Sequence, residues 1–545
     1  MSAKILTNCK VYTFDNTQPY ATALFIENGK IVALGNDANS FENPKTEQIN
    51  LQGSTIIPGL IDGHIHLKQY ALNLEKVDCD TKTREDCIQR VAEKARTLPE
   101  NQWILGHGWN HNEWQEGIGN AKLLDQYTQH HPVLLTAKSL HAAWCNSKAL
   151  KISGITKHKK NPRGGIIARD KNEEPTGILY ESAVSIVQNM IPVPSISEIT
   201  TAVKVAQDNL LSYGITGVHD FDKRDAFQAF QNLDKTGDLK LRITKNLPLD
   251  YLDDAIAIGL QNGFGNDYLK IGAIKLFSDG ALGPQTAAMI SPYKGQPKNR
   301  GMLFLNAKEI VEIGKKATQN SLPLAIHAIG DRAVHEVLIG IRMLIEYEND
   351  HDLKNQRHRI EHLQLIHPDD IQMFSSLPFI ASMQPIHAAS DKTMAIKFWG
   401  ERTKYAYAWK TVLDRGKGFV TLAFGSDAPV ETPNPFKGIY AAITRKRPDE
   451  SEPSENWTPE QRISLHEAIH AYTQGCAYAS STENHLGKLA PGYFADLVVL
   501  DRDIFNLPPR SLLELNCIAT MVNGEWVFQT NDKIGQEYFS SAFLS

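Results

Sequence analysis

Cysteine is scarce in this 545-residue sequence, and its spacing excludes two structural roles. The chain has six cysteines, and no two of them form a Cys-x-x-Cys pair. Scattered cysteines of this kind predict neither a disulfide framework nor a zinc site built from thiolates. We therefore expect the cysteines to stay reduced.

Long hydrophobic runs and an excess of one charge are also missing. No stretch approaches the roughly 20 consecutive apolar residues that a membrane-spanning helix needs. The first residues, MSAKILTNCKVYTFD, lack the apolar core of a secretory signal. Basic and acidic residues nearly balance, 57 against 62, so we expect no nucleic-acid partner and no membrane partner. Together these absences predict a cytoplasmic protein.

What remains is the composition of a globular protein that is rich in histidine. Hydrophobic residues make up 42% of the chain and charged residues 22%, which excludes disordered, collagen-like and coiled-coil classes. At roughly 150 residues per domain, the length predicts about three to four units, or fewer if a barrel takes up many residues. The 19 histidines are the unusual feature, and their positions decide the interpretation.

Both ends of the chain show the pattern of a β-hairpin. Asn28-Gly29 separates two apolar runs near one end, and Asn523-Gly524 does the same near the other. This dipeptide is a strong hairpin signal because both turn residues need positive φ. Neither end is long enough to enclose a core alone, so we expect residues 1–57 and 484–545 to form one small β-sandwich together.

The middle of the chain, 58–483, alternates strand and helix patterns. Eight candidate strands predict a (β/α)8 TIM barrel, an α/β fold whose active site lies at the carboxyl ends of its strands. These strands end near His64, Asp220, Pro248, Lys275, His327, His362, Gln384 and Gly425. Residues 68–210 interrupt the alternation after the first strand with strands and helices of their own. We expect an α/β insertion that packs over the barrel mouth.

Residues that can bind metals stand at five of the eight strand ends. His64 and His66 are two positions apart, so a strand would direct both imidazoles to the same face. The other candidates are Lys275, His327, His362 and Asp427, at the ends of the fourth, fifth, sixth and eighth strands. Each of them alone is more often an ordinary strand-end residue than a ligand. Their joint placement predicts a metal site in the barrel mouth.

Lys275 needs a separate explanation because it lies inside an apolar strand. A buried lysine is costly unless it is paired or neutralised. Its neutral amine could react with CO2 to give a carbamate, whose two oxygens can bridge two cations. A salt-bridged lysine in the core is the more common alternative.

Five segments carry a resemblance to a known family. PGLIDGHIH, IKLFSDG, AIHAIGD, RIEHLQ and FGSDAPV are similar to the metal-site segments of the amidohydrolase superfamily. The similarity is closest to its YtcJ-like branch, which includes N-substituted formamide deformylase. It covers nearly the whole chain, including LGKLAPGYFADLVVLD near the C-terminus and HAAWCNSKAL in the insertion.

The resemblance implies a binuclear metal centre and a hydrolytic reaction. One metal would take His64 and His66, the other His327 and His362, with carbamylated Lys275 as the bridge and Asp427 on the first metal. Nitrogen and oxygen ligands favour two Zn2+ per chain, with Mn2+, Fe2+ or Co2+ as alternatives. A hydroxide that bridges the metals would attack a carbonyl, and Asp427 would act as general base and then as acid. The expected reaction is hydrolysis of a C–N bond, of the amide or N-formyl type, in a small-molecule substrate.

Further residues are candidates for contact with substrate or for support of the site. His387 follows the seventh strand and could hydrogen-bond the substrate, and Asp279 could orient the metal ligands. Trp109 and Trp114 could form an apolar wall over the substrate, or they could only pack the insertion against the barrel. His141 is either a mouth residue or a cap on the following helix.

Other functions stay open from the sequence alone. The same metal site could act on a lactone, an ester or a carbamate, or it could deaminate a heterocycle. Members of the superfamily that deaminate usually lack the bridging lysine, so Lys275 counts against deamination. A catalytically silent binding scaffold is the non-enzyme alternative, although all six expected ligand positions are retained. A homodimer is also open, because the sequence does not give the oligomeric state.

Overall fold

The computed structural model describes residues 3–41, 46–110, 114–137, 142–449 and 457–530. The chain forms two compact units. One unit combines Met1–Tyr70 with Val203–Ser545, and the other is the segment Ala71–Ala202 between them.

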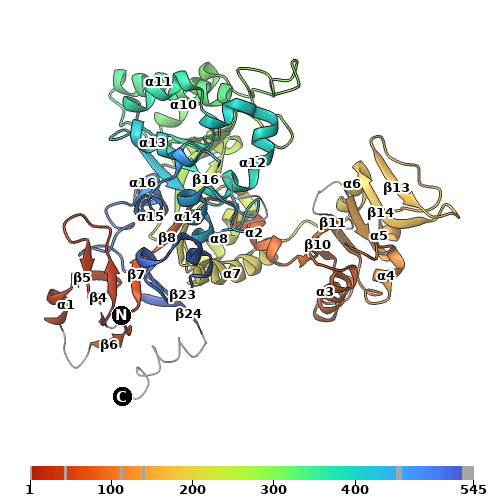
Figure 1. The fold of residues 1–545 in the computed structure, drawn as a ribbon, viewed down its shortest axis with the longest axis horizontal. Coiled ribbons are helices and arrows are strands. Elements are labelled where there is room, and N and C mark those ends of the chain that lie inside the picture. Colours follow the sequence, from red (N-terminus) through yellow and green to blue (C-terminus); the bar gives the residue numbers. More distant parts are fainter. Residues whose placement is uncertain (1–2, 42–45, 111–113, 138–141, 450–456, 531–545) are drawn as a thin grey trace. The chain divides into compact units, whose positions relative to one another are not determined.

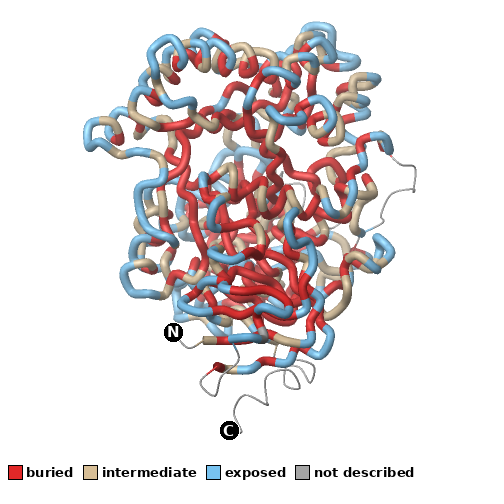
Figure 2. Tube along the Cα trace, turned by 90° about the vertical axis from the view of Figure 1, so that its left-hand side faces the viewer, coloured by how far each residue is buried: buried red, intermediate tan, exposed pale blue. Residues whose placement is uncertain are grey.

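The larger unit contains the predicted barrel. Eight parallel strands form one sheet and follow one another in the order of the sequence, which confirms the (β/α)8 fold class (Figure 1). They are β8 (Leu60–Ile65), β15 (Ile215–Asp220), β16 (Arg242–Pro248), β17 (Leu269–Phe277), β18 (Leu324–Ala328), β19 (Arg359–His362), β20 (Phe379–Met383) and β21 (Val420–Phe424). Most residues of these strands are buried, and Figure 2 shows the buried residues in red along the chain.

Helices follow the strands and cover the sheet. In α10, for example, the apolar residues Ile310, Val311 and Ala317 lie on one buried face, and Asn306 with Glu309 forms a capping box at the helix start. The helices after β15 to β21 are α8 (Arg224–Thr236), α9 (Leu252–Ala257), α10 (Ala307–Thr318), α11 (Asp331–Asp350), α12 (Pro385–Trp399), α13 (Trp409–Arg415), α14 (Pro435–Thr444), α15 (Leu465–Tyr472) and α16 (Gln474–Ala479).

Two glycines allow the first and last barrel strands to meet. The amide of Asp427 donates to the carbonyl of His64 at 2.7 Å, and the amide of His66 donates to the carbonyl of Ala428 at 2.9 Å. A Cβ at Gly63 would lie 2.8 Å from the Phe424 carbonyl oxygen, and a Cβ at Gly425 would lie 2.4 Å from the His64 amide nitrogen. The barrel therefore closes where its candidate ligands stand.

The two chain ends form two further sheets. One sheet has the order β5-β4-β1-β6 and the other the order β24-β23-β22-β7-β2-β3. The first contains β1 (Lys4–Thr7), β4 (Leu24–Glu27), β5 (Lys30–Leu34) and β6 (Glu47–Asn50), and the second contains β2 (Lys10–Tyr12), β3 (Tyr20–Ala21), β7 (Thr55–Pro58), β22 (Leu497–Leu500), β23 (Cys517–Val522) and β24 (Glu525–Gln529). Apolar side chains from both sheets share one core. The antiparallel pair of β7 with β22 joins the two ends of the chain, as expected for the sandwich.

Both predicted hairpin turns are present. Asn28-Gly29 connects β4 with β5, and Asn523-Gly524 connects β23 with β24. All four residues have positive φ, between 51° and 78°. The two turns also touch, because a Cβ at Gly29 would lie 2.4 Å from the Asn523 side-chain oxygen.

The segment Ala71–Ala202 has a sheet and cores of its own. Its strand order is β13-β14-β12-β11-β10-β9. The strands are β9 (Val77–Asp78), β10 (Ile104–Trp109), β11 (Val133–Ala137), β12 (Ala142–Cys145), β13 (Gly165–Arg169) and β14 (Pro175–Glu181), with helices α3 (Arg84–Thr97), α4 (Ala121–Asp125), α5 (Ser147–Ile152) and α6 (Ser182–Gln188). Two clusters of buried apolar residues fill this unit. Its placement over the barrel mouth stays a prediction.

Within the part of the chain that the structure describes, no helix is long and apolar enough to cross a membrane.

Candidate metal centre

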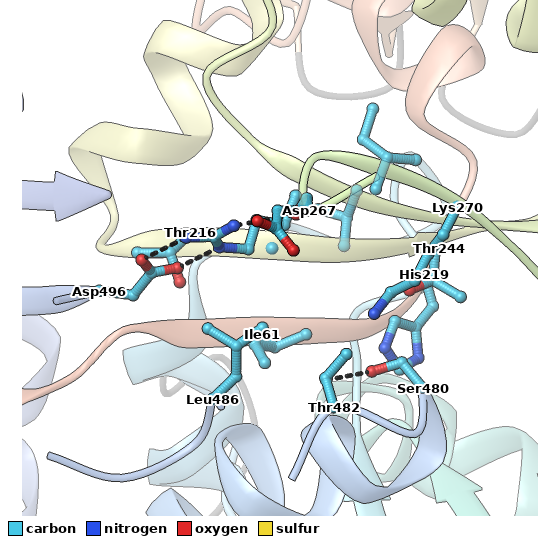
Figure 3. A pocket seen from close by; sticks show the side chains of 14 residues that line it. Ile61, Thr216, His219, Thr244, Asp267, Lys270, Ser480, Thr482, Leu486 and Asp496 are labelled. Carbon is cyan, nitrogen blue, oxygen red and sulfur yellow. Dashed lines mark hydrogen bonds and ion pairs between the residues drawn. The ribbon is translucent and has the colours of Figure 1, made fainter. Parts of the chain in front are cut away.

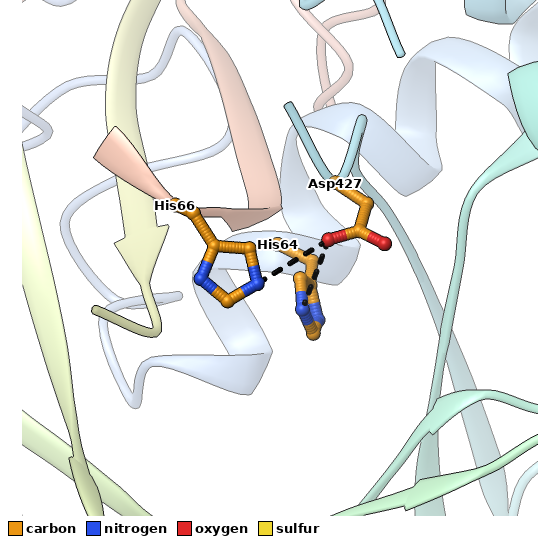
Figure 4. Close-up of side chains that lie close together, drawn as sticks. All are labelled: His64, His66 and Asp427. Atoms are coloured by element: carbon orange, nitrogen blue, oxygen red, sulfur yellow. Dashed lines mark ion pairs between the residues drawn. The ribbon is translucent and has the colours of Figure 1, made fainter. Parts of the chain in front are cut away.

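Three of the predicted ligands converge at the junction of β8 and β21. His64 and His66 project from the end of β8, and Asp427 follows β21 (Figure 4). The Asp427 Oδ1 atom lies 3.7 Å from His64 Nε2 and 3.5 Å from His66 Nε2. Both separations are longer than the donor–acceptor distance of a hydrogen bond. The three side chains therefore surround a common point without bonding one another.

A buried ion pair fixes the ring of His64. Its Nδ1 lies 2.7 Å from Glu361 Oε2, and Arg359 in turn donates to both Glu361 oxygens. The Arg359 guanidinium also donates to the Gly63 carbonyl, so it braces the same strand end. Because ionised Glu361 accepts the proton on Nδ1, the Nε2 lone pair of His64 faces Asp427.

A second carboxylate stands behind His66. Asp222 Oδ1 lies 3.6 Å from His66 Nδ1. Asp222 accepts from the Lys68 amide at 2.6 Å, and Lys245 pairs with the neighbouring Asp220 at 2.6 Å. Asp220 and Lys245 are fully buried. These contacts hold the turn after β15 against the start of α2 (Leu67–Leu74), next to His66.

Lys275 lies in the barrel interior without a hydrogen-bond or ion-pair partner among the described residues. Its Nζ is 4.7 Å from the centre of the Phe221 ring and 4.9 Å from that of Phe277. Burial lowers the pKa of this amine to about 8. The alternative of a salt-bridged core lysine is therefore not what the structure shows.

His327 and His362 stand side by side, with ring centres 4.6 Å apart. His327 Nε2 lies 2.9 Å from the Gly280 carbonyl, so its Nδ1 is the free nitrogen. His362 Nδ1 lies 2.8 Å from Gln384 Oε1, so its Nε2 is free. The backbone of His362 has φ 72° and that of Asp427 φ 59°, conformations rare for residues other than glycine and often found at functional sites.

The donor atoms fit a divalent cation. One ring nitrogen each of His64 and His66 and one Asp427 oxygen lie within 4.8 Å of one another, and His362, His387 and Asp427 form a second such group. Around tetrahedral zinc, ligands at 2.0–2.1 Å are about 3.3 Å apart, close to the 3.5 and 3.7 Å seen here. His327 belongs to neither group within the described ranges.

Comparison with known proteins settles the family. The model of the amidohydrolase family matches residues 47–528. The chain belongs to the amidohydrolase family. It is 32% identical to YtcJ of Bacillus subtilis (strain 168), which is named as an amidohydrolase, over 95% of this chain and 98% of that protein. It is 25% identical to the N-substituted formamide deformylase of Arthrobacter pascens, over 95% of this chain and 97% of that enzyme.

Solved structures agree with this assignment. A metal-dependent hydrolase from Pyrococcus furiosus, whose function is uncharacterised, superposes with a TM-score of 0.75 at 29% identity. The superposition covers 93% of this chain and all of that one. The chain is thus a hydrolase of the amidohydrolase family with a metal-dependent hydrolase fold.

In this amidohydrolase, the His387 side chain contacts Asp427, one of the candidate metal ligands. It lies in the first turn of α12, and its Nε2 is 3.2 Å from Asp427 Oδ2. Burial alone would lower the pKa of His387, but the hydrogen bond and charge of Asp427 raise it to about 9. Burial would raise the pKa of Asp427, and His387 with the other imidazoles holds it well below its usual value. The two side chains therefore form a charged pair.

Asp279 supports the site and does not face a substrate. Its carboxylate accepts hydrogen bonds from the amides of Ala288, Ile329 and Gly330. It also lies 3.5 Å from His327 Nε2. Because its oxygens are bound to the backbone in the interior, the carboxylate is not available to contact a substrate. Its expected part in orienting the ligands stays a prediction.

The two tryptophans of the insertion are core residues. Trp109 and Trp114 are 1% and 4% exposed, and their indole nitrogens donate to the carbonyls of Leu135 and Thr81. Their rings stack on each other within the core of the insertion itself. The apolar substrate wall is therefore wrong for this pair, because both side chains are already enclosed by their own unit. His141 lies outside the described residues.

The residues that hold the ligands were missed from the sequence. Glu361 bonds His64, Arg359 bonds Glu361, and Asp222 lies beside His66. Asp62 accepts from the amides of both His64 and Ser426. Arg359 and Glu361 are two apart on a strand, as are His64 and His66. A charged pair at this spacing inside an apolar strand is the signal that could have identified them.

Proposed function

We propose that this amidohydrolase hydrolyses the C–N bond of an amide or N-formyl group in a small molecule, with two divalent cations as cofactors. The observation that carries the proposal is the orientation of the imidazoles. His64 and His362 each use Nδ1 to bind a buried side chain and leave Nε2 free. Free imidazole nitrogens next to a carboxylate are typical zinc ligands.

The ligand assignment combines this geometry with the family resemblance. His64, His66 and Asp427 would hold one cation, and His327 and His362 the other. Lys275 lies in the interior without an acidic partner among the residues that the structure describes, so a carbamate formed from its amine and CO2 would supply the bridging oxygens. Two cations held in this way polarise a carbonyl group and lower the pKa of a water molecule.

The protein's own groups would then move the proton. Oδ1 of Asp427 faces His64 and His66, and its Oδ2 bonds His387. Held by His387, the ionised carboxylate would accept the proton of the attacking water and return it to the departing nitrogen. The formamide deformylase among its relatives supports a C–N bond as the target.

A substrate panel with metal analysis tests the proposal. The purified protein would be assayed with formamides, other amides, lactones, esters, carbamates and amino-heterocycles, and its metals measured by mass spectrometry. We expect about two metals per chain and turnover of at least one amide or formamide, abolished by a chelator and restored by Zn2+. Turnover of the lactone, ester or heterocycle alone would contradict the bond assignment. Loss of both metals and all activity in a folded protein would favour a binding scaffold.

A further inference from the structure

A second polar pocket lies in the larger unit, away from the candidate ligands. It is small, with a cavity volume of about 20 Å³, which limits a ligand to the size of one or two water molecules. Residues from β8, β15 and β16 line it, together with the start of β17 and the chain that follows α16 (Figure 3). None of the candidate metal ligands is among its lining residues.

Three polar side chains form a row across one wall of this pocket. His219 of β15 is the register partner of Thr244 in β16, and Thr244 is the partner of Lys270 in β17. Partners in adjacent parallel strands direct their side chains to the same face of a sheet. Figure 3 shows the three side chains together at one end of the pocket.

Each of the three has a donor group with no partner in the described part of the chain. Arg359 donates to His219 Nδ1 at 2.8 Å, and because an arginine can only donate, the imidazole proton sits on Nε2. The His219 residue is only 2% exposed, yet this N–H has no acceptor. The Thr244 hydroxyl and the Lys270 ammonium likewise make no hydrogen bond or ion pair.

The charges around the row leave Lys270 without a counter-ion in contact. Arg242, which lines the same pocket, is bonded through two nitrogens to Asp496 at 2.6 and 2.9 Å. Asp267 is exposed, and it and Glu483 favour the charged Lys270 only from a distance, because neither forms an ion pair with Lys270 among the described residues. Burial and then the charge of Arg242 lower the pKa of Lys270 to about 8. A row of free donors beside a partly buried ammonium that contacts no carboxylate of the described residues is suited to an anion.

We propose that this pocket binds a small monovalent anion, a halide or a carboxylate the size of formate, between His219, Thr244 and Lys270. One negative charge would balance the Lys270 ammonium. The imidazole N–H and the hydroxyl would donate to the same ion. Such an anion would stabilise the folded protein, because the three donors come together only when β15, β16 and β17 are paired.

Bromide is the probe for the first test. Crystals of the protein would be soaked in sodium bromide, and its anomalous signal would locate the ion. We expect a peak between His219 Nε2, Thr244 Oγ1 and Lys270 Nζ. Added sodium formate distinguishes the two classes of anion, since formate that removes the peak identifies a carboxylate site and formate that leaves it unchanged identifies a halide site. The proposal would be overturned if the pocket held only bridging water molecules and gave no anomalous peak at any bromide concentration.

Thermal unfolding in solution provides an independent test with variants. At constant ionic strength, with sodium gluconate as the reference salt, the preferred anion at ten times its dissociation constant should raise the midpoint by about 1–2 °C. Lys270→Met should lose this increase while it keeps its metals and its fold. Thr244→Val should weaken it, and the exposed-lysine control Lys235→Met should retain it. An equal increase in all four proteins would show a general salt effect and refute the site.

Discussion

At the scale of single residues, three of the candidate ligands are each held by a neighbour that sets their orientation. Glu361 holds His64, Gln384 holds His362, and His387 holds Asp427. Such contacts fix which nitrogen or oxygen is free to bind a cation or a proton. Substitutions of a ligand and of the residue behind it should therefore have different signatures.

Asp427→Asn separates metal binding from proton transfer. The amide keeps the size and one oxygen of the carboxylate but cannot act as a base, so the variant should keep its metals better than its turnover. We expect kcat to fall by about 10²–10⁴-fold, measured beside the metal content. Asp370→Asn is the matched control, because Asp370 pairs with His335 at 2.8 Å outside the centre. Full activity of Asp427→Asn with every substrate would exclude this residue as the proton shuttle.

Glu361→Gln tests the residue behind a ligand. Burial would raise the pKa of Glu361, but Arg359 and His64 hold it well below its usual value, so the wild-type carboxylate is ionised. A neutral amide lacks the negative charge that strengthens the hydrogen bond from His64 Nδ1 and makes Nε2 a better ligand. Metal affinity should fall by about 10–100-fold, as measured by competition with a chelator.

A buried pair outside the centre provides the control for this variant. Glu348 lies 3.1 Å from His358, and both side chains are fully buried. Glu348→Gln should therefore alter stability and leave metal affinity unchanged. If both glutamine variants lost metal equally, the loss would reflect general destabilisation of the barrel.

At the scale of helices and strands, the sequence was most informative about where strands end. All eight barrel strands end within two residues of the predicted positions, because apolar runs followed by Gly, Ser, Asp or Pro mark both burial and termination. The Asn-Gly turns were equally clear. Side-chain partners such as Glu361 with His64, which are 297 residues apart, depend on strand register and closure and could not be predicted.

The insertion shows which features the sequence could not predict. Its strands near Ile104 and Val133 were predicted from their apolar residues. The sequence did not predict the direction of the Trp109 and Trp114 side chains, because an apolar ring suits a substrate-binding wall and a protein core equally well. Only the surrounding residues of the folded unit decide between them.

Gly425→Ala tests the junction of β21 and β8. The added Cβ would lie 2.4 Å from the backbone nitrogen of His64, so the two strand ends must separate. We expect activity to fall more than stability, because the shift displaces His64 and Asp427 while most of the barrel is untouched. Gly283→Ala is the control, since its added Cβ would meet only the Met394 sulfur at 4.0 Å. Equal activity of the two variants would show that the strand ends can separate without displacing the ligands.

At the scale of the whole molecule, one ion pair connects the barrel with the sandwich. Arg242 begins β16, and Asp496 directly precedes β22 of the C-terminal segment. Both side chains are almost fully buried. Asp496 also accepts from the amide of Asn523, in the hairpin turn between β23 and β24. One carboxylate thus joins three segments that are far apart in the sequence.

Asp496→Asn should consequently destabilise the protein much more than a surface change would. The asparagine keeps the shape but leaves the Arg242 charge uncompensated in the interior, which costs about 3–5 kcal/mol when a buried pair is broken. Urea unfolding followed by tryptophan fluorescence measures the effect. Asp503→Asn is the control, because Asp503 pairs with the exposed Lys10 and such a pair contributes about 0–1 kcal/mol. Similar losses in the two variants would mean that water reaches Arg242 and that the ion pair does not hold the sandwich to the barrel.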